Sequence, residues 1–404
     1  MIREGYMMKK KILFVINNLN CGGAEKALIS LLEIMDYSKF DVDLLLFKRE
    51  GIFISKIPKQ VNLLPEPENY KYFDMSIKTA VIELIKKRRI DIALARILSL
   101  YTFKTEKKKS VVEQKVWKYL SIALRKLDYK YDVAIGYLEK NPIYFCVDKV
   151  NAKKKIGWIH NDYEKLEMDK KIDDKYFNKL DYVFTVSEEC LNVLKKIFPQ
   201  YKEKFKIMHN IVSDKAIKKL SLEKVTDVQF NNEDINIVSV GRLNYQKGFE
   251  MAIEACSILK EKGYKIKWNI IGDGEERSNL EMLINIFNVK EEFKLLGIRE
   301  NPYPYVAQSN IYVQPSRFEG KSIAIDEAKI LRKPIVLTNF STAKDQIENK
   351  VNGLICDMNS YSLAKEIEML IRDSKLWSKF VENLSDEKLG NEDEIIKLYE
   401  VIVI

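Results

Sequence analysis

The sequence is poor in the residues that build metal and disulfide sites. Its 404 residues include two histidines, and its five cysteines are scattered without any CxxC pair. An odd, dispersed set of this kind fits reduced thiols better than a zinc or disulfide framework, so we assign no function to Cys21, Cys146, Cys190, Cys256 and Cys356. No loop offers a convincing aspartate pair of the DxD kind, and we interpret Asp173-Asp174 as part of a helical charge run. We therefore expect neither a metal ion nor another cofactor.

Long apolar runs are also missing. The apolar runs, such as residues 12–16 and 335–337, contain five residues or fewer and fall far short of the roughly 20 residues of a membrane-spanning helix. The basic start of the chain precedes an apolar stretch of about five residues, shorter than the roughly 7–15 of a secretory signal. The sequence therefore predicts a cytoplasmic protein without a spanning helix or a secretory leader.

Positive charge is concentrated in one part of the chain. The net charge is +9, and residues 86–126 contain thirteen Lys or Arg against three acids. Apolar and aromatic residues are interleaved with these cations, a composition that suits the anionic inner surface of a cell membrane. The same pattern also fits a solvated helical face over an ordinary core, and both interpretations stay open. Nucleic-acid binding is not expected, because no recognition motif accompanies the charge.

Strand-like runs alternate with helix-periodic segments along the whole chain, which is typical of parallel sheets covered by helices. The pattern restarts at INIVSVGR after a polar stretch. We predict an α/β fold with two facing, Rossmann-like, doubly wound domains and a central cleft. The predicted division is an N-terminal domain over 1–213, a linker over 214–234, a second domain over 235–385 and a C-terminal helix over 386–404 that can cross back to the first domain. Ligands are then expected in the loops that follow strands.

The first such loop contains Gly22 and Gly23 but lacks the GxGxxG of a dinucleotide site, which disfavours an NAD-dependent oxidoreductase. Two glycines before a helix let the backbone approach a ligand and leave N–H groups at the helix start available to anionic or hydroxyl oxygens. A tight turn without a ligand explains the same residues. Both interpretations of this loop stay open.

Cations and carboxylates follow two strands of the second half. SVGRLNYQKG places Arg242 and Lys247 between a strand and a helix, where a guanidinium and an ammonium can stabilise a diphosphate both when bound and as a leaving group. Glu319 follows the strand-like run IYVQPS, and Glu327 comes eight residues later on the next helix. Both carboxylates can therefore project to one side and accept hydroxyls of a sugar and a ribose.

Three further candidates stand at strand ends. His160 ends the run KKIGWIH, and this position favours a functional role, whereas His209 in KIMHN is interpreted as structural. The turn GDG, residues 272–274, either contacts the nucleotide or only reverses the chain.

Together these pieces resemble the retaining nucleotide-sugar glycosyltransferases of glycosyltransferase family 4, which have the GT-B fold. The similar segments cover nearly the whole chain and read GGAEKAL, WIHND, FTVSE, VGRLNYQKGFE, IIGDGEE, LLGIREN, SRFEGKSIAIDEA and NGLICD. The resemblance implies that Arg242 and Lys247 hold the donor diphosphate, that Glu327 holds the ribose, and that Glu319 binds hydroxyls of the transferred sugar. It implies that His160 contacts the same sugar from the other domain.

The resemblance also assigns the remaining site residues. Gly22 and Gly23 match loop glycines near the phosphates and the acceptor, and Gly272 is placed near the nucleotide. Many members have EGFG after the first glutamate and touch the sugar through its backbone, whereas this chain continues with Gly320, Lys321 and Ser322. The two changed residues, lysine and serine, alter the pocket that selects the sugar.

The resemblance implies transfer of a sugar from a nucleotide-sugar, with UDP expected as the carrier, with retention of anomeric configuration and without metal. Together with the basic region, it suggests a saccharide or undecaprenyl-linked oligosaccharide acceptor, as in the synthesis of a bacterial capsule or other surface polysaccharide. Two alternatives remain: a nucleotide-sugar epimerase or hydrolase of the same fold, which needs no acceptor, and a non-catalytic scaffold subunit of a polysaccharide assembly complex.

Overall fold

The chain folds into two units, each built on its own parallel sheet. The computed structural model describes residues 9–20, 22–231 and 233–403, so that Cys21 lies outside the described residues. The first unit extends to His209 and includes the chain from Glu394 onward, and the second is made mainly of Asn210–Asp393. The predicted fold class, α/β with two Rossmann-like doubly wound domains, is confirmed by the strand orders given below.

The sheet of the first unit has seven parallel strands in the order β3-β2-β1-β4-β5-β6-β7. The chain moves outward from β1 to β3, then returns to the other side of β1 and continues to β7. The strands are β1 (Lys10–Ile16), β2 (Phe40–Leu46), β3 (Asn62–Leu63), β4 (Lys130–Gly136), β5 (Asn151–Ile159), β6 (Tyr182–Thr185) and β7 (Phe205–Ile207). The helices that alternate with them are α1 (Gly23–Glu33), α6 (Asn141–Lys149), α7 (Lys170–Phe177) and α8 (Glu188–Ile197).

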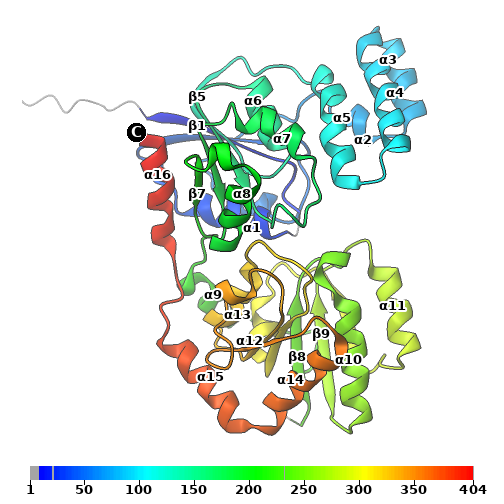
Figure 1. Cartoon of the computed structure of the whole chain (residues 1–404), viewed down its shortest axis with the longest axis vertical. Coiled ribbons are helices and arrows are strands. Elements are labelled where there is room, and N and C mark those ends of the chain that lie inside the picture. Colours follow the sequence, from blue (N-terminus) through cyan, green and yellow to red (C-terminus); the bar gives the residue numbers. More distant parts are fainter. Residues whose placement is uncertain (1–8, 21, 232, 404) are drawn as a thin grey trace, which may run out of the picture. The chain divides into compact units, whose positions relative to one another are not determined.

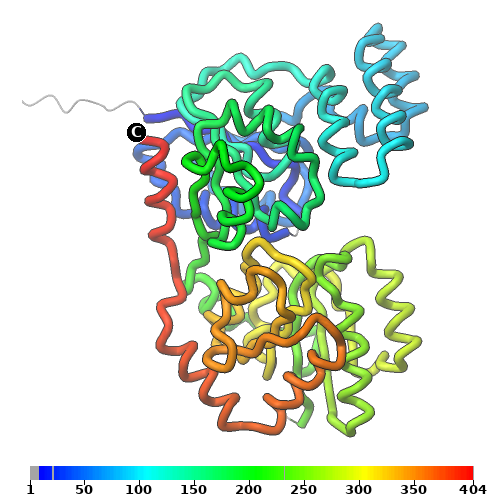
Figure 2. Tube along the Cα trace, in the orientation of Figure 1, coloured from blue at the N-terminus to red at the C-terminus, as the bar shows by residue number. Residues whose placement is uncertain are grey.

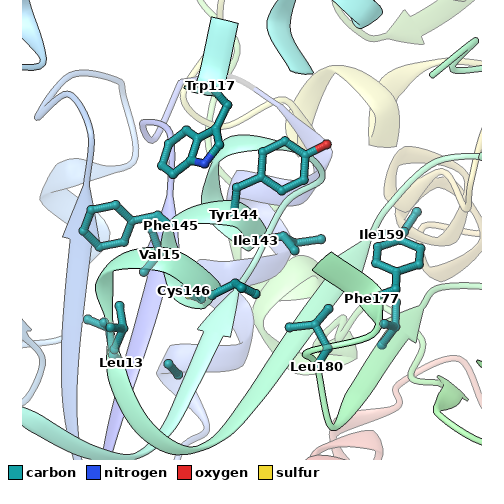
Figure 3. Packing of buried hydrophobic residues seen from close by; sticks show 14 of the residues in the cluster. Leu13, Val15, Trp117, Ile143, Tyr144, Phe145, Cys146, Ile159, Phe177 and Leu180 are labelled. Atoms are coloured by element: carbon teal, nitrogen blue, oxygen red, sulfur yellow. The ribbon is translucent and has the colours of Figure 1, made fainter. Parts of the chain in front are cut away.

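A core of apolar side chains joins this sheet to its helices (Figure 3). Leu13 and Val15 of β1 contribute from the sheet, and Ile143, Phe145 and Cys146 contribute from α6. Residues 12–16 of β1 are all buried and read as a continuous apolar run, as expected for a central strand covered on both faces.

A polar network lies within this apolar core. The carboxylate of Asp173 accepts hydrogen bonds from the hydroxyls of Tyr144 and Tyr163 and from Nε2 of Gln114, at 2.9 Å for the last. Burial raises the pKa of Asp173, while these donors oppose the shift. Asp173, interpreted from the sequence as part of a helical charge run, is therefore a buried structural group that ties α7 to neighbouring helices.

Four helices are inserted between β3 and β4 (Figure 1). They are α2 (Lys71–Asp74), α3 (Ile77–Lys86), α4 (Ile90–Thr105) and α5 (Lys109–Ala123). Figure 2 shows the chain turning back between α3 and α4, which lie side by side. The basic stretch found in the sequence therefore forms part of a helical layer.

The sheet of the second unit has six parallel strands in the order β10-β9-β8-β11-β12-β13. The strands are β8 (Ile235–Val240), β9 (Ile266–Ile271), β10 (Phe293–Gly297), β11 (Ile311–Gln314), β12 (Ile335–Thr338) and β13 (Leu354–Cys356). The helices are α9 (Asp214–Leu220), α10 (Phe249–Glu261), α11 (Arg277–Ile286), α12 (Tyr303–Gln308), α13 (Ile323–Ile330), α14 (Ser360–Arg372) and α15 (Ser374–Asp386). Short 3-10 turns are η1 (Ile54–Lys56) and η2 (Pro199–Tyr201) in the first unit, η3 (Tyr245–Lys247) and η4 (Ala343–Asp345) in the second, and η5 (Glu392–Glu394) just before the last helix.

The described residues of the segment predicted as a linker, 214–234, instead pack within the second unit. It begins with α9, which lies against α12 and α13 and is capped by the side chain of Ser213. Val225, Val228 and Phe230 then pack against the apolar core of this unit. The polar composition of the segment hides these few apolar contacts, which explains why the sequence favoured a linker.

The C-terminal helix α16 (Ile395–Val403) packs against the first unit. The Nζ of Lys10 donates to the carbonyl of Ile402 at 2.9 Å, and the ring of Tyr399 lies 5.0 Å from that of Phe40. The backbone N–H of Asp36 donates to the Tyr399 hydroxyl at 2.8 Å. These contacts add α16 to the first unit, whereas α15 belongs to the second.

Across the described parts of the chain, every helix is too short or too polar to cross a membrane.

Candidate functional site

The strand order of the second unit places its candidate residues at a topological switch point. Successive strands run from β8 outward to β10, and the chain then returns to β11 on the other side of β8. The loops that leave the carboxyl ends of β8 and β11 therefore meet at the carboxyl edge of the sheet, beside the switch point, where α/β folds bind ligands. Arg242 and Lys247 follow β8, and Glu319 follows β11.

The loop after β8 is shaped by a cap and by a glycine. The side chain of Asn244 accepts a hydrogen bond from the backbone N–H of Lys247, which closes the turn η3. Gly248 then adopts a left-handed conformation with φ of 63°, and a Cβ there would lie 2.3 Å from the carbonyl of Pro315. Arg242 is exposed, while Lys247 is partly buried.

Lys247 and Glu319 form an ion pair across the two loops. The Nζ of Lys247 lies 2.6 Å from Oε1 of Glu319, and both side chains are largely buried. The same oxygen accepts from the hydroxyl of Ser316 at 2.6 Å and from Nε2 of Gln314 at 3.3 Å, and Nε2 of Gln246 reaches Oε2 at 3.3 Å. Four donors therefore hold this carboxylate in one orientation; of these, only Lys247 was among the predicted site residues.

Glu327 is fixed separately, on α13. It is buried, and its Oε1 accepts from the hydroxyl of Tyr303 at 3.0 Å. At the start of the same helix, Gln346 bonds both backbone groups of Ser322, accepting from its N–H at 2.9 Å and donating to its carbonyl at 2.8 Å. The segment that carries both predicted carboxylates is therefore held by long-range side-chain contacts.

Lys321 lies between the two glutamates in the sequence and is also largely buried. Its Nζ lies 3.6 Å from Oδ2 of Asp326, a separation longer than a good charge-assisted hydrogen bond. Gly320, beside it, is buried as well. The loop thus carries an additional cation two residues after Glu319 in the sequence, at the position where the resemblance expects a neutral residue.

The GDG turn packs directly on the loop after β8. Gly272 has a φ of 146°, and a Cβ there would lie 1.9 Å from the carbonyl oxygen of Gly241. The backbone N–H of Leu243 donates to the carbonyl of Asp273 at 3.0 Å. The GDG turn therefore supports the backbone that positions Arg242, and this role does not depend on a contact with the nucleotide.

Arg317 was missed by the sequence reasoning. One guanidinium nitrogen donates to the carbonyl of Tyr245 at 2.7 Å, another pairs with Glu250, and the group lies 4.0 Å from the centre of the Tyr245 ring. Its backbone N–H also donates to the carbonyl of Gln246 at 2.7 Å. Its position in SRFEG, two residues before Glu319, was the available signal. Arg317 clamps the Lys247 loop against the Glu319 loop.

In the first unit, His160 follows β5 and is buried among aromatic rings. Its ring lies 4.9 Å from that of Tyr137 and is stacked 5.9 Å from that of Trp158. Burial lowers the pKa of His160 to about 3, an effect that the backbone of Tyr137 partly opposes. Neither ring nitrogen reaches hydrogen-bond geometry with another described residue. The imidazole is therefore neutral at physiological pH and suited to hydrogen bonding rather than to charge stabilisation.

Glu139 holds the backbone on which His160 stands. Its Oε1 accepts from the N–H of His160 at 2.7 Å and from the N–H of Asn161 at 3.0 Å. Burial raises the pKa of Glu139, an effect that these backbone donors oppose. Sequence reasoning did not single it out, because its partners are distant in the sequence, although it follows β4 at the edge beside β5.

The remaining predicted residues are less constrained. Gly23 begins α1, and a Cβ there would meet nothing within 4 Å. Nδ1 of His209 lies 3.0 Å from the carbonyl of Val186, and its backbone N–H donates to Glu394, which fits the structural role expected of it. The four described cysteines are buried thiols, and burial raises the pKa of both Cys256 and Cys356 to about 12.

Known proteins share parts of this sequence. Residues 222–386 match the family model described as "Glycosyl transferases group 1". The chain is 27% identical to an uncharacterized glycosyltransferase of Methanocaldococcus jannaschii, over 57% of this chain and 65% of that protein. It is 29% identical to an N-acetylgalactosamine-N,N'-diacetylbacillosaminyl-diphospho-undecaprenol 4-alpha-N-acetylgalactosaminyltransferase of Campylobacter jejuni, over 50% of this chain and 53% of that protein. The chain thus aligns with less than two thirds of either relative. Both are named as transferases of sugars, in agreement with the enzyme class predicted from the sequence.

The fold extends the similarity to nearly the whole chain. HepE of Anabaena, solved in complex with UDP-glucose, matches with a TM-score of 0.67 over 98% of each chain, at 16% identity. In sequence, residues 222–386 are therefore similar to the group 1 glycosyltransferases, and in fold the chain as a whole is similar to a solved protein that binds a nucleotide-sugar.

Proposed function

We propose that this chain is a glycosyltransferase that transfers a sugar from a UDP-sugar to a saccharide acceptor with retention of anomeric configuration. The observation that carries the proposal is the Lys247–Glu319 pair at the switch point of the second unit. A cation and an acceptor-only carboxylate, oriented side by side, suit the two parts of a nucleotide-sugar, its diphosphate and its sugar hydroxyls.

In the proposed reaction, the bond between C1 of the sugar and the diphosphate oxygen breaks, and the electron pair leaves with UDP. The acceptor hydroxyl forms the new bond to C1 on the face that UDP leaves, and its proton passes to a diphosphate oxygen. Lys247 and Arg242 would offset the negative charge that grows on the leaving group, which favours the transition state over the bound substrate. Two cations in these positions supply the charge that a metal ion provides in other enzymes.

The other residues would bind and orient the donor. Glu327, held by Tyr303, would accept the ribose hydroxyls, and Glu319 would accept hydroxyls of the sugar. Neutral His160 would bond the same sugar, as the resemblance implies, and Gly22 and Gly23 would lie near the acceptor. Gly272, Gly320, Lys321 and Ser322 would line the donor side.

For the acceptor, we propose a saccharide linked to a polyprenyl diphosphate, used in building a capsule or another cell-surface polysaccharide. Support comes from the Campylobacter jejuni relative, whose name specifies a diphospho-undecaprenol saccharide. The reaction would then take place at the cytoplasmic face of the membrane.

The first experiment is ligand binding without added metal. Saturation-transfer NMR or thermal shift would be measured with UDP-, GDP-, ADP- and CMP-sugars, with Lys247→Ala as the control. We expect a selective response to a UDP-sugar that Lys247→Ala loses. No response to any nucleotide-sugar would favour a non-catalytic scaffold subunit instead.

Product analysis then separates the enzymatic alternatives. With an acceptor present, proton NMR of the product should show a new glycosidic bond with the anomeric configuration of the donor. An epimerase or hydrolase would convert the donor equally well without acceptor, which would contradict the proposal.

A further inference from the structure

Helix α4 faces solvent with most of its large apolar side chains and, apart from Ile92, faces the protein with small or polar ones. Its buried residues are Ile92, Ala93, Ala95, Arg96, Ser99 and Thr102. Its exposed residues include Leu94 and Tyr101, whose exposed fractions are 55% and 69%. A helix on the surface of a water-soluble domain normally shows the opposite arrangement.

The exposed residues form a continuous stripe. Ile90, Leu94, Ile97, Leu98 and Tyr101 are all exposed, and their spacing of three and four residues places them on one face of the helix. The adjacent helix α3 adds the exposed residues Ile82 and Ile85. Apolar groups scattered singly over a surface need no explanation, whereas a cluster of this size marks an interaction site.

The buried side of α4 is well fixed, so the exposed stripe does not result from a loosely packed helix. Nε of Arg96 donates to the carbonyl of Tyr72 at 2.8 Å, and its other nitrogens donate to Ser99 and to the carbonyl of Met75, both at 3.1 Å. These bonds tie α4 to the short helix α2. The hydrogen bonds of Arg96 therefore fix the orientation of α4, and in this orientation its apolar face points to solvent.

Cations border this face at both ends of α4. Lys86, Lys87 and Arg88 are exposed where α3 ends and the turn before α4 begins; at the other end, Lys104 lies in the last turn of α4 and residues 107–109 follow it. Residues 77–109 contain ten Lys or Arg against three acids. Two of those acids are already paired, Asp91 with Arg89 at 2.9 Å and Glu106 with Lys115 at 2.7 Å. The face therefore combines apolar groups with excess positive charge.

We propose that this α3–α4 face, defined by the exposed residues of 82–109, docks on the surface of an anionic lipid bilayer. The apolar side chains would enter the boundary between head groups and acyl chains, and the lysines and arginines would meet the anionic head groups. A second copy of the chain fits less well, because its own excess of cations would be brought against this one. The docking surface is separate from the donor site and does not depend on the reaction proposed above.

Vesicle flotation tests the proposal with a matched pair of variants. Leu94→Glu/Leu98→Glu changes two exposed apolar residues one helical turn apart on α4, and Met282→Glu/Ile286→Glu makes the equivalent change on α11, where the exposed fractions are 53% and 65%. With vesicles of phosphatidylcholine and phosphatidylglycerol, we expect the α4 variant to lose about tenfold or more in partition coefficient, because charge is placed where burial is required. The α11 variant should behave as the wild type.

A second comparison tests the charge. Lys107→Glu/Lys108→Glu should lower partition to anionic vesicles by about fivefold for each unit of charge removed, and added salt should weaken wild-type binding. Vesicles of phosphatidylcholine alone should bind the wild type much more weakly. Circular dichroism melting and the thermal shift with a UDP-sugar keep folding and donor binding separate from docking.

Three results would overturn the proposal. The first is that the wild type does not bind anionic vesicles, and the second is that the α4 and α11 variants bind them equally. The third is that light scattering shows a dimer without lipid and that the α4 variant is monomeric. The last would identify a second copy as the occupant of this face.

Discussion

The Nζ of Lys247 and Oε1 of Glu319 lie 2.6 Å apart, although 72 residues separate them in the sequence. The pair joins the loop after β8 to the loop after β11, the two strands that meet at the switch point. Removing one member of a largely buried ion pair leaves the other desolvated and without its partner. Replacing either Lys247 or Glu319 is therefore unfavourable. The residues that would bind the donor are therefore also contacts between the loops that carry them.

Lys247→Ala should lower turnover by orders of magnitude, because the leaving diphosphate loses a cation that acts most strongly in the transition state. The fold should survive, since Glu319 keeps donors from Ser316, Gln314 and Gln246. Steady-state kinetics and circular dichroism would measure the two effects, with Lys290→Ala on the surface as the control. Normal turnover in a folded Lys247→Ala protein would remove this residue from the reaction.

Two glycines provide a contrast in stability. Gly272→Ala should destabilise the second unit, because its Cβ would lie 1.9 Å from a carbonyl oxygen and φ is 146°. The backbone strain alone costs about 1–3 kcal/mol. Gly23→Ala should leave the melting temperature unchanged, since its Cβ meets nothing within 4 Å. Differential scanning calorimetry measures both, and equal melting temperatures for the two variants would contradict the close packing of the GDG turn.

The stability of the first unit should depend on pH through His160. Its pKa in the folded protein is lowered to about 3, so the unfolded chain binds the proton more readily. Stability is therefore fully present above the unfolded pKa of about 6.5 and is lost as pH falls toward 3. Urea unfolding at pH 7 and pH 5 should show a smaller decrease for His160→Gln than for the wild type. An identical decrease in both proteins would mean that the histidine is not buried as described.

Glu139 is expected to act as a positioning residue through the backbone of His160. Glu139→Ala should lower kcat with little change in the KM of the donor, because two buried N–H groups lose their acceptor and the histidine loop shifts. Glu139→Gln keeps a carbonyl oxygen as acceptor and should restore most of the activity. Failure of the glutamine variant to rescue would indicate that the charge of Glu139, rather than its hydrogen bonds, is required.

The sequence predicted those parts of the molecule that depend on local pattern. The alternation of strands and helices specified two doubly wound sheets, and the loops after strands contained Lys247 and Glu319. Glu139, Gln246 and Arg317 were not predicted, because their partners are distant in sequence. The segment 214–234 was taken for a linker because its contacts are few and its composition is polar. The direction of the apolar side chains of α4 also required coordinates, since composition alone fits a membrane-facing and a solvated helix equally.

Lys321 provides the most specific prediction about the donor. Its ammonium lies 3.6 Å from Oδ2 of Asp326, and it belongs to the segment between Glu319 and Glu327 that we propose lines the donor side. Lys321→Ala should therefore change the relative KM values for different UDP-sugars. The affinity for UDP itself should stay nearly unchanged, because the cations proposed to hold the diphosphate are Arg242 and Lys247. Isothermal titration with UDP and kinetics with a panel of UDP-sugars would separate these effects.

Lys329→Ala is a suitable control, because Lys329 lies on the same helix as Glu327 and pairs with Glu387 at 2.7 Å. An equal loss of affinity for UDP and for every UDP-sugar would place Lys321 at the diphosphate instead. Unchanged KM values and unchanged affinity for UDP would indicate that Lys321 only pairs with Asp326 and does not contact the donor.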